Sequence, residues 1–430
     1  MNDHFTLAVT GQSLIKHDTR AVRSPEFDRI KAILRSADLA FTNFEGTIYG
    51  SHGGWPLKGF YFGSSTPEVL DALDDIGFRA MSLSNNHSFD LGPPGILSTL
   101  EEVGRRGFLY AGIGRSKSEA RGPASASFNG RRIAMVAMDG GPGPDFMYAQ
   151  DADGERSGRP GVNRIRMSRI LELEGKAFEQ LQSILDKAEY SALNLLMDNQ
   201  PDDEPPLEEG ELGIGRAIFR NSDRFKKTVR IDKDDLDANL KAIRSAADEG
   251  ELVIAYLHHH HWSSDWLLSP DWISDFARQC IDAGAAIFVS HGVPVLLPIE
   301  VYRGRPIFHS LGNFIFHTRS EIALWKHREV WESVVASCTF DADNRLTSLT
   351  LHPLIVGGEA GLQDENIENR LVPHLATGAS AERILNRVTA SSAYYGSQIE
   401  IVEGLGQVQL GRNHSTDVYS ATGWPHGSPR

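Results

Sequence analysis

The stretch GAAIFVSHGVPVLLPIEVYRGRPIFHSLGNFIF, residues 284–316, indicates the fold class of this chain. It opens with a short apolar run, 285–289, that predicts a buried strand. The run stops at Ser290-His291-Gly292, a polar turn of the kind that an α/β sheet exposes at its functional edge. One interpretation is two core strands and a hairpin, and the other is that His291 is a metal ligand on a strand-end loop. The rest of the chain decides between them.

Short apolar runs and helical patterns alternate over most of the chain. Strands are predicted at 5–10, 39–42, 80–83, 133–138, 252–257, 285–289, 334–340 and 346–354. Helices are predicted at 25–36, 67–76, 94–106, 234–247 and 269–283. This alternation is typical of a layered α/β fold.

The alternation is interrupted between 142 and 248. At 430 residues the chain is long for one compact core. We therefore predict one α/β domain built from 1–141 and 249–356, with 142–248 as an inserted cap or lid that carries a helix over 167–190. A solvated spacer is the alternative for the insertion. Residues 357–430 form a C-terminal extension, whose final part is predicted to be poorly ordered.

Bulk composition excludes several classes of protein. The formal charge of −14 argues against nucleic acid and anionic membranes as partners. Two cysteines are too few for a disulfide framework or a cysteine-rich zinc site. There is no apolar run of about 18 residues, and the N-terminus has no basic start or long apolar region. We expect no transmembrane helix and a cytoplasmic location.

Five of the predicted strands are followed by a small polar group. Because strand carboxyl ends share one edge of an α/β sheet, these groups are expected to converge. They are Gln12, Asn43 with Glu45, Asn86 with His87, the run His258 to His261, and His291. Imidazole, carboxylate and amide donors suit Mn²⁺, Fe²⁺ or Zn²⁺. Singly, each motif has a structural explanation, such as a helix cap for Asn86 or a turn cap for Glu45. Within the histidine run, alternation along a strand lets at most two side chains face one site.

Several segments resemble the CapA/PgsA family, the capsule and poly-γ-glutamate synthesis proteins of the calcineurin-like metallophosphatase superfamily. The matching segments are TGQSLI, ADLAFTNFEG, LSNNHSFDLG, YAGIGRS, GRPGVN, VIAYLHHHHW and the stretch 284–316. The resemblance spans roughly residues 5–320. It implies an α/β fold, a two-layered β sandwich flanked by helices, with metal-binding loops at one edge.

Two departures from the family pattern bear on the metal site. The family usually has Gly-Asp where this chain has Gly-Gln, at Gln12, and a final histidine where it has Pro294. In the superfamily both missing ligands serve the same metal. The resemblance therefore implies one surviving position, with a divalent cation, Mn²⁺ preferred and Zn²⁺ or Fe²⁺ as alternatives. Its ligands are Glu45, Asn86, His258 and His291. His17 or Asp18 is an alternative source of ligands for the second position.

Other residues receive catalytic or binding roles from the resemblance. His87, oriented by Asp90, corresponds to the general acid of the superfamily, and an imidazole suits that role near neutral pH. A histidine of the 258–261 run, assigned as His260, is a further ligand or base. The residues expected to contact substrate or to fix the strand-end loop are Gln12, Asn43, Lys58, Arg159 and Asn313.

These observations favour a metal-dependent hydrolase that uses metal-activated water on an amide or related carbonyl bond. The expected partner is a small carboxylated or peptide-like substrate, and homo-oligomerisation is left open. The alternatives are a phosphoesterase, a metal-assisted epimerase or isomerase, and a non-catalytic capsule or poly-γ-glutamate assembly protein.

Overall fold

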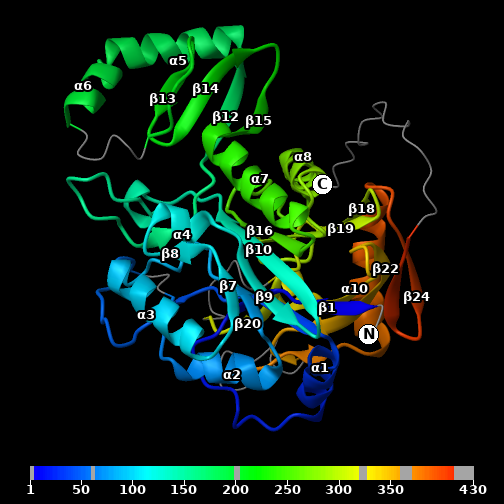
Figure 1. Ribbon diagram of the computed structural model, residues 1–430. Coiled ribbons are helices and arrows are strands. Elements are labelled where there is room, and N and C mark those ends of the chain that lie inside the picture. Colours follow the sequence, from blue (N-terminus) through cyan, green and yellow to red (C-terminus); the bar gives the residue numbers. More distant parts are fainter. Residues whose placement is uncertain (1–3, 60–62, 198–203, 319–326, 359–369, 411–430) are drawn as a thin grey trace.

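The computed structural model describes residues 4–59, 63–197, 204–318, 327–358 and 370–410. Two sheets lie face to face, and helices cover their outer faces (Figure 1). The larger sheet has the strand order β24-β25-β22-β21-β1-β3-β6-β7, with β23 paired to β22, and the smaller sheet has the order β18-β19-β17-β16-β10-β9. The predicted α/β fold, a two-layered β sandwich flanked by helices, is confirmed.

The larger sheet joins a parallel half to an antiparallel half. Strands β1, β3, β6 and β7 are parallel neighbours, whereas β1 pairs with β21 in antiparallel fashion. Its strands are β1 Phe5–Val9, β3 Leu39–Asn43, β6 Ala80–Ser82, β7 Leu109–Ala111, β21 Glu332–Phe340, β22 Leu346–Ile355, β23 His374–Leu375, β24 Gln398–Val402 and β25 Leu405–Gln409.

In the smaller sheet β10, β16, β17 and β19 run parallel, so three strand ends meet at the edge that carries the polar groups. Its strands are β9 Ala124–Phe128, β10 Arg131–Asp139, β16 Leu252–His258, β17 Ile287–His291, β18 Ile299–Tyr302 and β19 Arg305–Phe308.

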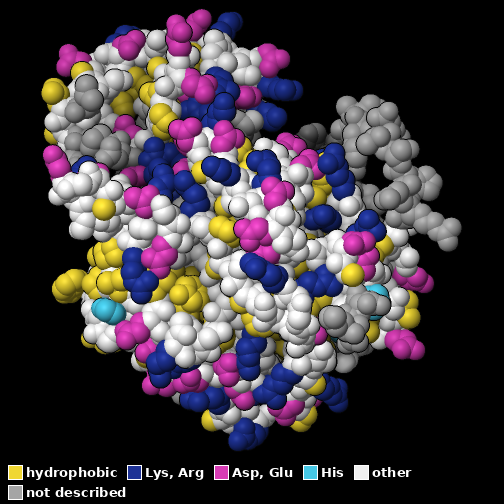
Figure 2. Space-filling view, viewed as in Figure 1, with side chains coloured by type: hydrophobic (Ala, Val, Ile, Leu, Met, Phe, Trp, Pro, Cys, Tyr) yellow, Lys and Arg dark blue, Asp and Glu magenta, His cyan; other side chains and the backbone are white. Residues whose placement is uncertain are grey.

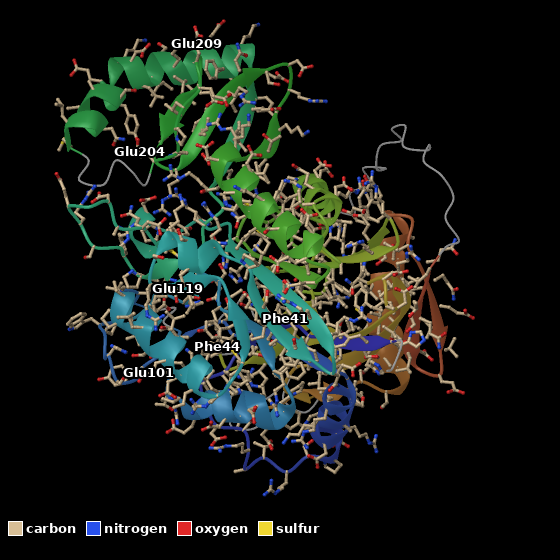
Figure 3. All side chains as sticks on the ribbon, viewed as in Figure 1. Phe41, Phe44, Glu101, Glu119, Glu204 and Glu209 are labelled. Atoms are coloured by element: carbon tan, nitrogen blue, oxygen red, sulfur yellow. The ribbon has the colours of Figure 1, made fainter. Side chains whose placement is uncertain are left out.

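Both faces of the central strands are buried, which explains their continuous apolar sequences. In β16, Ile254 and Tyr256 enter the core between the two sheets, whereas Val253 and Ala255 pack under the helices outside. Phe41 of β3 likewise lies between the sheets, and Phe44 lies on the helix side (Figure 3).

The helices predicted from periodicity are present and cover the sandwich. On the larger sheet lie α1 Pro25–Ser36, α2 Glu68–Ile76 and α3 Gly92–Arg105, and on the smaller sheet lie α7 Lys233–Asp248 and α8 Asp271–Asp282. The start of α1 is fixed by Ser24, whose hydroxyl oxygen accepts a hydrogen bond from the Phe27 amide at 3.3 Å. No described helix has the length and apolar character needed to span a bilayer.

The segment 142–248 contains a small sheet of its own, in the order β13-β14-β12-β15, which forms the upper lobe in Figure 1. Its elements are β12 Met167–Glu174, α5 Gly175–Lys187, α6 Tyr190–Met197, β13 Leu212–Ile214, β14 Ala217–Ser222 and β15 Lys226–Ile231. The helix predicted over 167–190 is wrong for 167–174, which is the central strand of this sheet. Its alternation buries Ile170 on the side covered by α5.

The C-terminal extension adds structure that the sequence analysis did not anticipate. Helix α10, Gly378–Ala393, sends Ile384 and Leu385 into the core between the sheets. The β24–β25 hairpin then pairs with β22 and extends the larger sheet. The tail predicted to be poorly ordered lies outside the described residues.

Candidate metal centre

Four strands of the sandwich end with a polar side chain turned toward the space between the sheets. Asp139, His258 and His291 are the last residues of β10, β16 and β17, and they are paired with one another in register. Side chains alternate along a strand, so each of these residues points to the same side as the apolar residue two positions before it. His258, for example, follows Tyr256 on the face between the sheets. Asn43 occupies the same position at the end of β3. The predicted convergence of these strand ends is therefore present.

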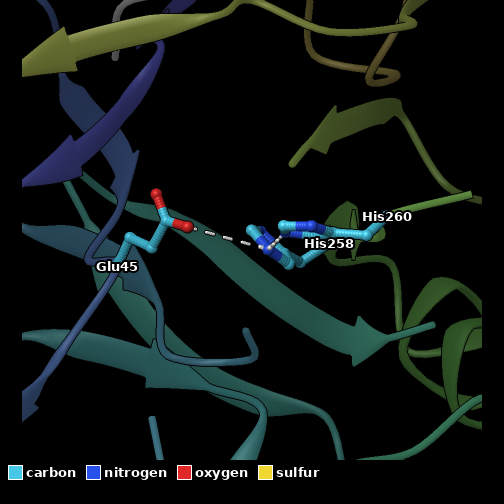
Figure 4. A group of neighbouring side chains, drawn as sticks. All are labelled: Glu45, His258 and His260. Atoms are coloured by element: carbon cyan, nitrogen blue, oxygen red, sulfur yellow. Dashed lines mark hydrogen bonds and ion pairs between the residues drawn. The ribbon is translucent and has the colours of Figure 1, made fainter. Parts of the chain in front are cut away.

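Three side chains bring ligand atoms close together at this edge (Figure 4). One ligand atom each from Glu45, His258 and His260 lies within 4.8 Å of the others. The Nε2 atom of His258 is 3.8 Å from Oε1 of Glu45 and 3.3 Å from Nε2 of His260. His258 and His260 share a side because they are two residues apart. His259 instead packs its ring on Trp272, with centroids 4.7 Å apart.

Several buried polar atoms around this group have no protein partner among the described residues. Unpaired buried donors and acceptors cost free energy unless water or an ion satisfies them. These atoms are Oε1 of Gln12, Oε2 of Glu45, Oδ1 of Asn86, Oδ1 of Asp139, Nδ1 of His258 and Nε2 of His291. Carboxylate, amide and imidazole donors that lack partners fit a divalent cation such as Mn²⁺, Fe²⁺ or Zn²⁺.

Burial favours the neutral forms of these side chains. Desolvation raises the pKa of Glu45, and it lowers the pKa of His258 far below its ordinary value. Desolvation, followed by the proximity of His87 and Lys58, lowers the pKa of His260 to about 3. The imidazoles are therefore neutral at physiological pH, which is the form that binds metals.

A second group, centred on His87, lies beside the metal ligands. The Nδ1 atom of His87 is 2.6 Å from Oδ2 of Asp90, which also accepts a hydrogen bond from the Gly63 amide at 2.7 Å. The other oxygen of Asp90 is 3.0 Å from Nζ of Lys58, and that ammonium group also donates to the Asn86 carbonyl. The predicted orientation of His87 by Asp90 is thus present as a contact.

One cavity of about 720 Å³ connects the two groups. Six residues predicted for the site line it: Gln12, Glu45, Lys58, Asn86, His87 and His260. Part of its wall is aromatic. The Trp262 ring stacks on His260 with centroids 4.9 Å apart, and Trp266 stacks on Trp262 at 6.3 Å. A substrate in this cavity therefore meets both the polar side chains of the candidate metal centre and a flat apolar surface.

The remaining predicted site residues do not line this cavity. His291 lies one strand from His258, with its Nδ1 atom 3.3 Å from the Tyr256 hydroxyl, and it is not part of the three-residue ligand group. Asn43 is fully buried and accepts a hydrogen bond from Asn85 at 3.2 Å. The roles of His291 as a metal ligand and of Asn43 as a substrate contact therefore remain predictions.

Asn313 and Arg159 make hydrogen bonds within the protein, and their predicted contact with substrate remains a prediction. The side-chain amide of Asn313 donates to the Val330 carbonyl at 3.2 Å, and its oxygen accepts from Gln12 at 3.2 Å. This arrangement fixes the strand-end loop, which was the other role expected for it. The guanidinium of Arg159 donates to the backbone carbonyls of Tyr148 and Asp145 at 3.0 and 3.1 Å, so it braces a loop outside the cavity.

The sequence analysis missed two residues at this edge. Asp139 is buried, accepts a hydrogen bond from the Tyr148 hydroxyl at 3.1 Å, and has its pKa raised to about 7 by desolvation. A carboxylate at the end of an apolar strand is the signal that could have identified it. The side-chain amide of Asn85 donates to the Phe44 carbonyl at 2.8 Å and ties the loop that carries Glu45 to the loop that carries Asn86. No pattern in the sequence distinguishes that role.

The fold and this edge define a class: a two-layered α/β sandwich whose strand ends carry a candidate carboxylate–histidine metal site. Residues 6–318 match the family described as bacterial capsule synthesis protein PGA_cap, and the chain belongs to that family. The resemblance to CapA proteins inferred from the sequence motifs is thereby confirmed.

Known relatives cover the chain to different extents. The uncharacterized protein y4sH of Sinorhizobium fredii is 28% identical over 451 residues, which cover 95% of this chain and 94% of that protein. The PGA biosynthesis protein CapA of Bacillus subtilis is 25% identical, covering 67% of this chain and 56% of that protein. Among solved structures, a 5'-nucleotidase precursor from Thermus thermophilus aligns with a TM-score of 0.35 and 12% identity, covering 82% of this chain. The chain spans about half the length of that nucleotidase, 54%.

Proposed function

We propose that this protein is a metal-dependent hydrolase of an amide or related carbonyl bond in a small carboxylated or peptide-like substrate. The observation that carries this proposal is that the ligand group of Glu45, His258 and His260 lies beside His87. Glu45, His260 and His87 line the same cavity. A divalent cation held by this ligand set supplies Lewis-acid polarisation and an acidified water. The protein itself supplies the ligands, the proton donor and the walls that orient the substrate.

The ligand set favours a single cation over a pair. Gln12 and Pro294 both line the cavity at the positions where the family pattern has an aspartate and a histidine. The amide nitrogen of Gln12 donates to Asn313, so Gln12 offers a neutral amide oxygen in place of a carboxylate, and a proline has no ligand atom on its side chain. Two-metal phosphoesterases use both ions to hold the attacking and leaving oxygens. Loss of two ligands from one position argues for a reaction that a single ion can assist.

His87 is suited to give a proton to the leaving group. The Asp90 carboxylate can only accept, so the proton shared between them is on Nδ1 of His87. Nε2 is then the nitrogen that exchanges protons with a substrate. General acid–base assistance of this type contributes about 10² to 10⁴ in rate.

Charge in the cavity favours an amide over a phosphate ester. Of the described residues that line it, Lys58 is the single Lys or Arg, and its ammonium group is held by Asp90 and the Asn86 carbonyl. Phosphoryl transfer relies on cationic side chains or metal ions that clamp the phosphoryl oxygens. The aromatic wall of Trp262 and Trp266 suits the planar and apolar parts of an N-acyl or peptide-like substrate.

A second candidate function is a non-catalytic role in polymer synthesis. It is favoured by the names of relatives, which include a PGA biosynthesis protein and a probable polyglutamine synthesis accessory protein. That role requires no proton donor in contact with the cavity.

A substrate screen on the Mn²⁺-loaded protein separates these functions. N-acyl amino acids and γ-glutamyl amides are tested beside a generic aryl phosphate, with the wild type, His87→Gln and the exposed-site control His52→Gln. Amide turnover that His87→Gln abolishes and His52→Gln retains supports the proposal. Turnover of the phosphate alone supports a phosphoesterase, and saturable binding of γ-glutamyl polymer without turnover supports the accessory role.

A further inference from the structure

A second cavity, of about 380 Å³, lies between the inserted four-stranded sheet and the sandwich. Its lining is strongly basic, with four arginines and a single carboxylate among the described residues: Arg164, Arg166, Arg169, Arg216 and Asp145. Figure 2 shows Lys and Arg side chains gathered where the upper lobe meets the body of the molecule. The chain as a whole is acidic, so this local excess of positive charge runs against its average.

Two of these arginines are neutralised by acidic partners. Asp145 pairs with Arg164 and, at 2.9 Å, with Arg166, and Asp235 lies 3.1 Å from Arg164. Arg169 differs from them. Its Nε atom is buried without a partner, and within the described part of the chain no carboxylate forms an ion pair with its guanidinium.

The strand register places Arg169 beside a second cation. Arg169 and Leu171 lie on the same face of β12, and Leu171 is paired with Lys227 of β15. That face is turned to the sandwich, because its neighbours Met167 and Val229 pack against the core under α7 and α8. Desolvation lowers the pKa of Lys227, and the nearby Arg169 lowers it further, which is the effect of a like charge close by. An anion between them would relieve that repulsion.

This basic cavity adjoins the cavity of the metal centre. Pro142 lines both, and the consecutive residues His260 and His261 line one each. The ammonium group of Lys227 donates to the carbonyl of Trp262 at 2.5 Å, so the inserted sheet is attached to the aromatic wall of the metal-centre cavity. The two cavities are therefore neighbours.

We propose that Arg169, assisted by Lys227, is the anchor of an anion subsite for a carboxylate or phosphate group at the distal end of the substrate. This proposal rests on the proposed function in one respect, because it takes the metal centre as the place where the other end of the substrate reacts. Anion binding at the subsite itself needs no metal. It restricts the substrate to an extended molecule with an anionic group remote from the bond at the metal centre.

Titration calorimetry at low ionic strength tests the subsite with two probes, inorganic phosphate and succinate. The full-length protein is compared with Arg169→Gln, Arg169→Lys and the control Arg224→Gln. Arg224 lies between β14 and β15 and is highly exposed. Arg224→Gln removes the same charge as Arg169→Gln. We expect saturable binding of one or both probes, at least about tenfold weaker in Arg169→Gln, partly restored in Arg169→Lys and unchanged in Arg224→Gln. Thermal unfolding of each variant confirms that it is folded.

The two probes distinguish the chemistry of the anion: tighter phosphate binding indicates a phosphorylated substrate, and tighter succinate binding indicates a carboxylated one. Repeating the titration in the Glu45→Gln background separates this proposal from the metal-centre proposal. Arg169-dependent binding that persists there supports the subsite even if no hydrolase activity is found. Absence of saturable binding in the wild type, or equal weakening in Arg224→Gln, would overturn it.

Discussion

The Nδ1 atom of His87 lies 2.6 Å from the Oδ2 atom of Asp90, and both side chains are buried beside the metal ligands. The contact fixes the tautomer of the imidazole and makes Nε2 the nitrogen available to a substrate. Replacing His87 by Gln is expected to lower turnover about 10²- to 10⁴-fold. Metal content is expected to remain at the wild-type level, because His87 is not in the ligand group. Loss of the bound metal in His87→Gln would show that His87 is a ligand instead.

Gly63 is expected to be essential for the position of His87. A Cβ atom at Gly63 would lie 2.8 Å from Cβ, Cγ and Nδ1 of the His87 side chain, which is closer than carbon atoms approach one another. Gly63→Ala must therefore displace His87, lowering turnover and costing about 1–3 kcal/mol in free energy of unfolding. The matched control is Gly59→Ala, where an added Cβ has no atom of the described residues within 4 Å. Wild-type turnover in both variants would contradict the role of His87.

Acid is expected to destabilise the fold through its buried neutral histidines, and His317 gives the clearest case. Its Nδ1 accepts from the Lys16 amide, its Nε2 donates to the Leu371 carbonyl, both at 2.9 Å, and burial lowers its pKa to about 4 from 6.5. Because the unfolded chain takes up the proton first, this stabilisation is complete above pH 6.5 and is lost as the pH falls toward 4.

The size of this effect follows from the pKa difference and is about 3 kcal/mol. Urea unfolding of the wild type and His317→Gln at pH 7.5 and 4.5 measures it. The variant should be less stable than the wild type at pH 7.5 and should lose less stability on acidification. Parallel losses in the two proteins would show that His317 does not contribute.

Restoring the two lost ligands is expected to create a second metal position. Gln12 and Pro294 line the same cavity as Glu45, so Gln12→Asp combined with Pro294→His places a carboxylate and an imidazole near the existing site. The double variant should bind roughly one more Mn²⁺ per chain than the wild type and gain activity on aryl phosphates. Each single substitution should have a weaker effect. Unchanged stoichiometry in the double variant would mean that another residue occupies that position.

The strand ends were predictable because they follow from periodicity. The inward series Ile254, Tyr256 and His258 requires only a buried parallel strand and side-chain alternation, and both are legible in the sequence. The same rule would have identified Asp139, whose strand was predicted correctly. Alternation likewise explains why the side chains of His258 and His260 share one side and that of His259 faces the other.

Other features depend on contacts between distant segments and leave no local signal. Strand β12 was mistaken for helix because its pattern makes sense only beneath α5 and beside β14 and β15. Arg159 was predicted to contact substrate, and the loop that it braces was not foreseen, since a guanidinium that braces a loop and one that binds substrate look alike in a sequence. The packing of α10 over the open side of the sandwich is also a tertiary contact.

Metal content of the full-length, untagged protein tests the metal centre most directly. Plasma mass spectrometry after reconstitution with Mn²⁺, Zn²⁺ or Fe²⁺ compares the wild type with His258→Ala, His291→Ala and the exposed-site control His52→Ala. We predict roughly one ion per chain in the wild type and the control, and loss of the ion in His258→Ala. His291→Ala shows whether the neighbouring imidazole takes part. Absence of metal in the reconstituted wild type, or full retention in His258→Ala, would contradict a metal centre at Glu45, His258 and His260.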